Sequence, residues 1–416
     1  MSFPTATQAT PEETVRGLLG AERVRRAFSF FEEQAAGIDE AHAALVRVPA
    51  PPFGEAERAE YLRERFAECG LEGAALDAEG NCVALRRGQE SRPLLVLSAH
   101  LDTVFPAGTD CEVRREPSGL MRAPGVADDG CGLAALVALA RALNELEVGT
   151  QGSILFVGTV GEEGEGDLRG VRHLLTASEW AGRADAFISI DGPGLERITH
   201  AALASRRYRV TCRGAGGHSW GDFGVPNPVH ALGRAVARLA AYPAPKRPRT
   251  TFNVGRIEGG SGVNVIPREA RMDVDLRSES PAELGRLDAF FRRAARESAE
   301  DENASRRQGA PALEMEIRLI GDRPGGATPP EQPLVRLAAE ATRALGARPY
   351  LDCSSTDSNI AISRGLPAVT IGAGGASGNT HTLEEWYDPT GRDLGLKRAL
   401  LVALGVVGLQ ENSARR

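Results

Sequence analysis

The chain has 416 residues, 42% of them hydrophobic and 25% charged, so it is long enough for two or three compact units. This composition is typical of a globular protein and argues against global disorder or a fibrous structure. Asp and Glu outnumber Lys and Arg by 56 to 49, which argues against nucleic acid as the main partner because phosphate binding needs a basic face.

The cysteines indicate no metal or redox site, and neither the N-terminus nor the apolar stretches indicate export or a membrane span. The six cysteines lack C-x-x-C spacing, so they predict neither a structural zinc site nor a thioredoxin-type site. Met1–Glu12 has no basic start followed by an apolar stretch. Leu133–Leu143 and Leu396–Leu409 are interrupted by charges and are shorter than the roughly 20 apolar residues that span a bilayer. We therefore expect a cytoplasmic protein.

Short apolar runs alternate with amphipathic stretches in the outer parts of the chain. The expected helices are Asp39–Val48, Glu55–Cys69 and Leu133–Leu146, where apolar residues recur every three or four positions opposite charged ones. The expected buried strands are Pro93–Ser98, Ser153–Val160, Ala186–Ile190 and Pro367–Gly372. This alternation predicts an α/β domain with a mostly parallel sheet, in two parts at 1–203 and 323–416.

The middle of the chain, 204–322, has a different pattern and is expected to be an inserted domain. Its predicted elements are strand Arg206–Arg213, helix Pro228–Ala241, strands Thr250–Ile257 and Ala270–Arg277, helix Pro281–Ser298 and strand Leu313–Leu319. This β-α-β-β-α-β order is typical of a ferredoxin-like sandwich. The polar segment Asp301–Pro311 is expected to be an exposed connection.

The first buried strand ends at a possible ligand-binding pair, His100 and Asp102. Residues two apart in an extended backbone point to the same side, so both can reach one site. Open α/β sheets place ligands at the carboxyl ends of their strands. A strand-end histidine that caps a loop is the alternative.

Two acidic segments follow. Asp128 and Asp129 precede the predicted helix at Leu133, where they could bind a ligand or simply cap the helix. Glu162 and Glu163 lie among glycines directly after the second strand. Clustered carboxylates repel one another and glycines cost backbone entropy, so packing does not explain this run, although an exposed acidic loop remains an alternative.

Asp191 at the end of a third strand and His381 in a polar turn complete the pattern. Either residue alone would be unremarkable. Together, these separate segments supply imidazoles and carboxylates, which suit zinc and related divalent ions, whereas a purely structural site would favour thiolates. The joint pattern predicts a metal centre.

These segments, with the runs at 46–50 and 354–360, resemble the zinc metallopeptidase family of peptidase T, glutamate carboxypeptidase, aminoacylase and acetylornithine deacetylase/succinyl-diaminopimelate desuccinylase. Only about the first 35 residues lie outside the resemblance. It implies a hydrolase of peptide or amide bonds with two divalent metal ions, zinc above all, with cobalt or manganese also suited.

The resemblance also implies which residues hold the metals. One ion would be bound by His100, Asp128 and Asp191, and the other by Asp128, Glu163 and His381. Asp128 would bridge the two ions, and the family places a cis peptide bond directly after it.

Two further acids receive roles by the same resemblance. Glu162 matches the general base, which takes a proton from the water between the metals and hands it to the leaving amine. Asp102 is similar to the carboxylate that receives the second ring N–H of the ligand His100 and fixes its tautomer.

The inserted domain resembles the family's lid, through which many members form homodimers. His218 corresponds to the histidine that stabilises the oxyanion, in many members within the partner subunit's active site. The residues expected to contact substrate are Asn264, Arg277, Arg323, Gly374 and Gly375. Arg323 could instead be a solvated surface residue, and the two glycines could serve only a turn.

The leading hypothesis is a peptidase T-like aminopeptidase that acts on short peptides. A carboxypeptidase or an N-acyl-amino-acid deacylase fits the same motifs, and a non-catalytic metal-binding scaffold is a remote alternative. The other histidines, which are His42, His173, His200 and His230, are assigned no function.

Overall fold

The computed structural model describes residues 9–410, which form two compact units. Leu203–Gly326 is one unit, and the segments before Leu203 and after Gly326 together form the other. The corresponding sequence prediction placed the insertion at 204–322. Residues 1–8 and 411–416 lie outside the described part. The first of these ranges contains most of the N-terminal stretch for which the sequence predicted no export signal.

A nine-stranded sheet forms the centre of the first unit, in the order β1-β2-β6-β3-β7-β17-β8-β15 with β16 beside β8. Its middle strands run parallel and are β6 (Ser153–Thr159), β3 (Leu94–His100), β7 (Ala186–Ile190) and β17 (Ala368–Ile371). The outer strands are β1 (Glu72–Leu76), β2 (Cys82–Arg86), β8 (Arg197–Ala202), β15 (Gly326–Ala327) and β16 (Tyr350–Ser354). Because β3, β6 and β7 are buried at every position, both faces of the sheet are covered. The predicted mostly parallel α/β sheet is confirmed.

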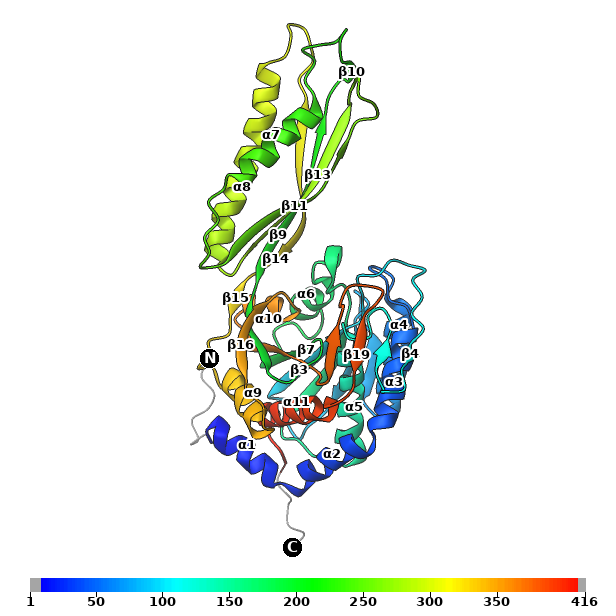
Figure 1. Cartoon of the computed structure of the whole chain (residues 1–416). Helices are drawn as coiled ribbons and strands as arrows, with labels where there is room; N and C mark the ends of the chain where they lie inside the picture. The colour runs from blue at the N-terminus through cyan, green and yellow to red at the C-terminus, as the bar shows by residue number, and fades with distance from the viewer. Residues whose placement is uncertain (1–8, 411–416) are drawn as a thin grey trace. The chain divides into compact units, whose positions relative to one another are not determined.

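Helices cover the two faces of this sheet, and β3 supplies alternate side chains to two cores. Leu95 and Leu97 pack into the core with α5 and α11, whereas Leu94 and Val96 pack into the core with α6 and α10. The helices are α4 (Ala56–Glu68), α5 (Gly130–Glu145), α6 (Arg169–Thr176), α9 (Pro333–Ala344), α10 (Ser358–Ser363) and α11 (Arg392–Val407) (Figure 1). Each fully buried leucine or valine in these cores contributes about 1.5–3 kcal/mol.

Two N-terminal helices were not predicted. α1 (Pro11–Gly20) begins with a capping box between Thr10 and Glu13, and α2 (Glu22–Glu33) follows at once. Both bury apolar side chains in the same core as α3 (Ala35–Arg47) and α5. Across residues 9–410, no helix combines the length and apolar character needed to cross a bilayer.

A second, small sheet brings two distant segments together. β18 (Ala376–Gly378) and β19 (Trp386–Asp388) form a hairpin that pairs with β5 (Met121–Arg122), which in turn pairs with β4 (Arg114–Arg115). The turn of the β18–β19 hairpin contains His381, and the chain after β5 leads to Asp128. The two predicted ligands are therefore held by neighbouring strands.

The second unit has the β-α-β-β-α-β order expected from the sequence. Its elements are β9 (Ala204–Arg213), α7 (Pro228–Ala240), β11 (Thr250–Gly259), β13 (Glu269–Ser278), α8 (Pro281–Ala304) and β14 (Glu314–Arg323), in an antiparallel sheet ordered β11-β13-β9-β14. A short pair, β10 (Gly217–His218) and β12 (Val265–Ile266), lies apart from this sheet. Figure 1 shows α7 and α8 on the same side of the sheet.

One predicted boundary in this unit was wrong. The segment from Asp301 was expected to be a connection, but α8 continues to Ala304. Ala295, Ser298, Ala299 and Glu302 are all buried, so the inward face of the helix continues past the predicted end at three- and four-residue spacing. Composition missed this because the buried residues include a serine and a glutamate.

Candidate active site

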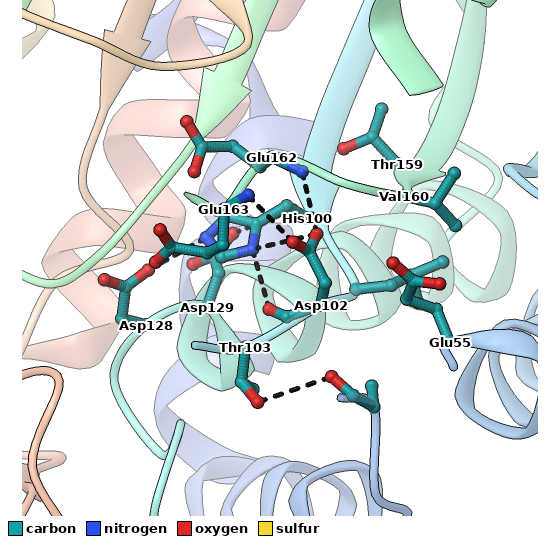
Figure 2. Close-up of polar contacts among 12 residues, drawn as sticks. Glu55, His100, Asp102, Thr103, Asp128, Asp129, Thr159, Val160, Glu162 and Glu163 are labelled. Carbon is teal, nitrogen blue, oxygen red and sulfur yellow. Dashed lines mark hydrogen bonds and ion pairs between the residues drawn. The ribbon is translucent and has the colours of Figure 1, made fainter. Parts of the chain in front are cut away.

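The five predicted metal ligands lie together in the first unit. His100, Asp128 and Asp191 place one ligand atom each within 4.8 Å of one another, and Asp128, Glu163 and His381 do the same. Nε2 of His100 is 2.8 Å from Oδ1 of Asp128, whereas Nε2 of His381 is 3.0 Å from the other oxygen, Oδ2. The two oxygens of Asp128 thus face different histidines, as a bridging ligand requires. Figure 2 shows Asp128 beside Glu163 and His100.

The parallel sheet explains why three of these segments meet. His100 ends β3, the glutamates follow β6, and Asp191 follows β7. His100 is in register with Thr159 on β6, and Ser98 with Ser189 on β7, so the strands end at the same edge. His381 reaches that edge from its hairpin with φ +66°, a left-handed backbone that is uncommon outside glycine and often marks functional sites.

Asp129 caps α5, whereas its neighbour Asp128 faces the ligand cluster. The peptide bond between these two residues is cis, as the resemblance implied. Oδ1 of the buried Asp129 accepts N–H groups from Gly132, in the first turn of α5, and from Gly192. Its Oδ2 accepts the N–H of His100. The helix-cap alternative therefore holds for Asp129, whereas Asp128 lies among the predicted metal ligands.

Asp102 contacts the His100 ring through both its carboxylate and its main chain. Nδ1 of His100 lies 3.7 Å from the carboxylate, an ion-pair distance, and 2.9 Å from the main-chain oxygen of Asp102. The carboxylate also accepts the main-chain N–H groups of Glu162 at 2.9 Å and Glu163 at 2.8 Å (Figure 2). Asp102 therefore fixes the turn that carries the predicted base and its neighbouring ligand, because two N–H donors satisfy a buried carboxylate well.

Glu385 is a site residue that the sequence analysis missed. Its fully buried carboxylate accepts the N–H groups of Gly125, Ala127 and Asp128, at 3.1, 2.8 and 3.0 Å. It thus holds the loop that presents Asp128. Its place next to Glu384 in the polar turn after His381 gave no local sign of this role, because its three partners are about 260 residues away along the chain.

The charge of the cluster favours a bound cation. Contacts with Asp128 and Glu163 raise the pKa of His381 to about 10, and burial together with Asp128 raises the pKa of Asp191 to about 6. Burial also raises the pKa of Asp128, but contacts with His100 and His381 outweigh it and hold that pKa below its usual range. The carboxylates thus favour a positive charge at His381, a role that a bound divalent ion would also fill, and the nitrogen and oxygen donors fit zinc.

A further buried acid, Asp357, lies behind the cluster. Its Oδ2 accepts the hydroxyl of Thr159 at 2.5 Å, and its Oδ1 has no hydrogen-bond partner among the described residues. Burial raises the pKa of this carboxyl to about 7. The protonated form is therefore the one that the fold favours.

This pKa predicts a pH-dependent stability effect for Asp357→Asn in metal-free protein. The pKa is raised on folding, so the stabilisation from Asp357 is full below the unfolded pKa, near 3.8, and is lost as pH rises through about 7. Above that pH the wild-type protein must bury a carboxylate, which asparagine avoids. Urea unfolding should show the free energy of unfolding of the variant rising relative to wild type between pH 5 and pH 8, by at most about 4 kcal/mol. At higher pH this difference should stay constant. A pH-independent difference would contradict the assignment.

In the second unit, His218 lies on β10 with its ring exposed. Its Nδ1 accepts the main-chain N–H groups of Trp220 at 3.2 Å and Gly221 at 3.3 Å. Since Nδ1 is an acceptor here, the neutral ring carries its hydrogen on Nε2, which can then act as a donor. The main-chain oxygen of Asn264 accepts the N–H of Ser219 and so joins the loops of the two short strands.

The other residues predicted to contact substrate each have a contact or a backbone conformation that serves the fold itself. Arg277 donates to Asp275 at 2.6 Å, and Arg323 is only 4% exposed, so the alternative of a solvated surface arginine was wrong. Gly374 and Gly375 have φ values of +81° and +73°, and a Cβ on either would approach main-chain oxygens within 2.7 Å. Both glycines are required by a tight turn, whatever contact they make with substrate.

A mostly parallel sheet with imidazole and carboxylate groups gathered at its carboxyl edge, and a further glutamate beside them, is a layout suited to a metal-dependent hydrolase. The chain belongs to peptidase family M20/M25/M40, whose family model matches residues 96–403. It is accordingly a hydrolase of the peptidase or amidohydrolase kind.

The individual proteins that this chain resembles share at most about a third of its residues in the matched region. Succinyl-diaminopimelate desuccinylase from Nitrosococcus oceani is 30% identical over 235 residues, which are 52% of this chain and 61% of that protein. Aminopeptidase PepT from Bacillus cereus has a similar fold, with a TM-score of 0.70 and 21% identity over 89% of this chain and 98% of that one. The Bacillus subtilis YXEP protein, described as a dinuclear metal binding peptidase, matches with a TM-score of 0.65 and 18% identity over 91% and 100%.

Proposed function

We propose that this protein is an aminopeptidase that uses two divalent metal ions, most simply zinc, to hydrolyse short peptides. The observation that carries the proposal is the convergence of two ligand groups that share Asp128, with Glu162 and Glu163 side by side on a turn held by Asp102. His100, Asp128 and Asp191 would hold one ion, and Asp128, Glu163 and His381 the other.

Bound at these residues, the ions would lower the pKa of water and polarise the scissile carbonyl. Glu162 would accept a proton from the attacking water and return it to the leaving amine. Glu162 is 6% exposed, and its main-chain N–H is held by Asp102, so its carboxylate starts from a fixed backbone. His218 would donate its Nε2–H to the oxyanion. Asn264, Arg277 and Arg323 remain the proposed substrate contacts, with Gly374 and Gly375 beside them.

We further propose a homodimer formed through the inserted unit, in which His218 serves the partner subunit's active site. This proposal rests on the resemblance of the Gly216–Ser219 segment to the family's oxyanion loop. The contacts at Nδ1 of His218 support the oxyanion-binding part of this proposal, because they leave Nε2–H as the donor.

Removal of an acyl group from an amino acid is the second candidate activity, and the sequence similarity to a desuccinylase favours it. The fold similarity to aminopeptidase PepT supports short peptides instead. Both reactions break an amide bond, so the same catalytic groups serve either one. The two candidates differ in whether a free α-amine must be recognised.

A matched substrate panel separates them. Zinc-loaded protein is assayed on Ala-Ala-Ala, its N-acetyl and C-amide derivatives, and N-succinyl- and N-acetyl-alanine. An aminopeptidase should cleave Ala-Ala-Ala and its C-amide but not the N-acetyl peptide. Cleavage only of the N-acyl amino acids would assign a deacylase, and a requirement for the free carboxylate would assign a carboxypeptidase. Chelator-treated protein and Glu162→Gln, assayed in parallel, exclude a contaminating peptidase.

A further inference from the structure

We propose that His42 is a positioning residue that holds the Asp128 loop through Val126 and so sets the affinity of the metal centre. The inference rests on the proposed metal-binding function of Asp128. It concerns a fully buried histidine on α3 to which neither the sequence motifs nor the proposed mechanism assigns a role.

The hydrogen bonds of His42 define its tautomer. A guanidinium nitrogen of Arg392 lies 2.6 Å from Nδ1, and guanidinium groups can only donate, so Nδ1 is the acceptor. Nε2 therefore carries the hydrogen and donates it to the main-chain oxygen of Val126, also at 2.6 Å. Burial, and secondarily Arg392, lower the pKa of His42 well below its ordinary value, which agrees with a neutral ring. Val126 lies two residues before the shared ligand Asp128.

Arg392 is itself held on several sides. Its guanidinium donates to Asp39 on α3 at 2.5 Å and to the hydroxyl of Tyr387 at 3.1 Å. That hydroxyl donates to the main-chain oxygen of Gly374, also at 3.1 Å. Tyr387 belongs to the β18–β19 hairpin that carries His381. The buried arginine thus contacts both the His42 ring and the hairpin of a second proposed ligand, and its bonds to Asp39 and Tyr387 do not depend on His42.

The Asp128 loop is held from two sides by complementary groups. Glu385 accepts N–H groups from Gly125, Ala127 and Asp128, whereas His42 donates to the carbonyl of Val126 between them. A Cβ on Gly130 would lie 2.6 Å from Val46 and 3.0 Å from Nε2 of His42, so the loop also packs closely against α3. Without His42, the Val126 carbonyl and an Arg392 N–H lose their buried partners, and the loop gains freedom on that side.

Zinc affinity is the decisive measurement, because it does not depend on turnover. His42→Phe keeps a buried ring but removes both hydrogen bonds, whereas His42→Gln keeps a donor and an acceptor. Competition with a chromophoric chelator should show zinc affinity about 10- to 100-fold lower for His42→Phe, as for other residues that orient metal ligands, and largely restored for His42→Gln. Because Asp128 belongs to both ligand groups, binding of both ions should weaken.

A matched control is His173→Phe, the same substitution at a histidine of α6 whose Nε2 lies 3.9 Å from Asp77. It should bind zinc like wild type. Urea unfolding of the metal-free variants gives an independent measure of fold stability. If His42→Phe does not fold, Asp39→Asn, which weakens the support of Arg392, should lower zinc affinity several-fold.

Two results would overturn the proposal. One is wild-type zinc affinity in a folded His42→Phe, and the other is equal weakening in His42→Phe and His42→Gln, since hydrogen bonding would then not be the cause. Failure of the proposed aminopeptidase activity is a separate outcome, because zinc binding by wild type and variants is measured whether or not any peptide is cleaved.

Discussion

Glu162→Gln should lower kcat for amide hydrolysis by about 10²–10⁴-fold while zinc content stays at the wild-type level. Glutamine keeps the size of the side chain, and the main-chain N–H that Asp102 holds is unchanged, so the turn should keep its conformation. The amide cannot accept a proton from water or return it to the amine. Steady-state kinetics and metal analysis on the same protein sample make the measurement.

The control for this experiment is Glu165→Gln, an exposed acid in the same turn, which should retain activity. Full activity of Glu162→Gln would refute the proposed general base. Loss of a metal ion from Glu162→Gln would instead place Glu162 among the ligands. The geometry allows that outcome, because His100, Glu162 and Glu163 form a third group of possible ligands.

The same variant tests whether His218 acts in the partner subunit. Glu162→Gln and His218→Ala should each be nearly inactive alone. If two chains share each active site, a dimer of the two variants has one complete site, in which the intact Glu162 of one chain meets the intact His218 of the other. About half of the dimers formed on mixing are of this kind, so mixing should restore up to about a quarter of wild-type activity. No recovery after demonstrated subunit exchange would assign His218 to its own chain's site or to no catalytic role.

His381→Ala should lose both activity and one of the two metal ions. His381 lies within 3.0 Å of Asp128 and Glu163, and its removal leaves only carboxylates in that ligand group. Affinity for that ion should fall by more than about 100-fold, because even residues that only orient ligands contribute 10- to 100-fold. Metal analysis after dialysis should give close to one ion per chain, against two for wild type.

His230→Ala is the matched control, because that histidine lies on α7 in the other unit with its side chain 65% exposed. It should bind both ions and remain active. Two tightly bound ions in His381→Ala would show that this histidine is not a ligand, and the second metal site would then have to be reassigned. Loss of both ions would show that the two sites bind cooperatively through Asp128.

Local patterns predicted those elements whose burial follows their own periodicity. The strand Ala186–Ile190 has the predicted bounds, and Ser153–Val160 differs from β6 by one residue, because both are continuous apolar runs. α2 was missed although its pattern is local, because Val24, Ala27, Phe28 and Phe31 recur at three- and four-residue spacing and pack into the core shared with α5. The end of α8 was missed for a different reason, because Glu302 is buried with Arg234 as its partner.

The sequence by itself determined the chemistry of this protein: imidazoles and carboxylates at successive strand ends, with a pair of glutamates on a glycine-rich turn. Only the tertiary structure decided how those groups are held. The carboxylate of Asp102 contacts a turn 60 residues away, Glu385 holds a loop 258 residues away, and His42 reaches Val126 across 84. The physical reason is that a residue's own chemistry fixes what it can bind. Its hydrogen-bond partner, by contrast, depends on which distant backbone groups packing buries beside it.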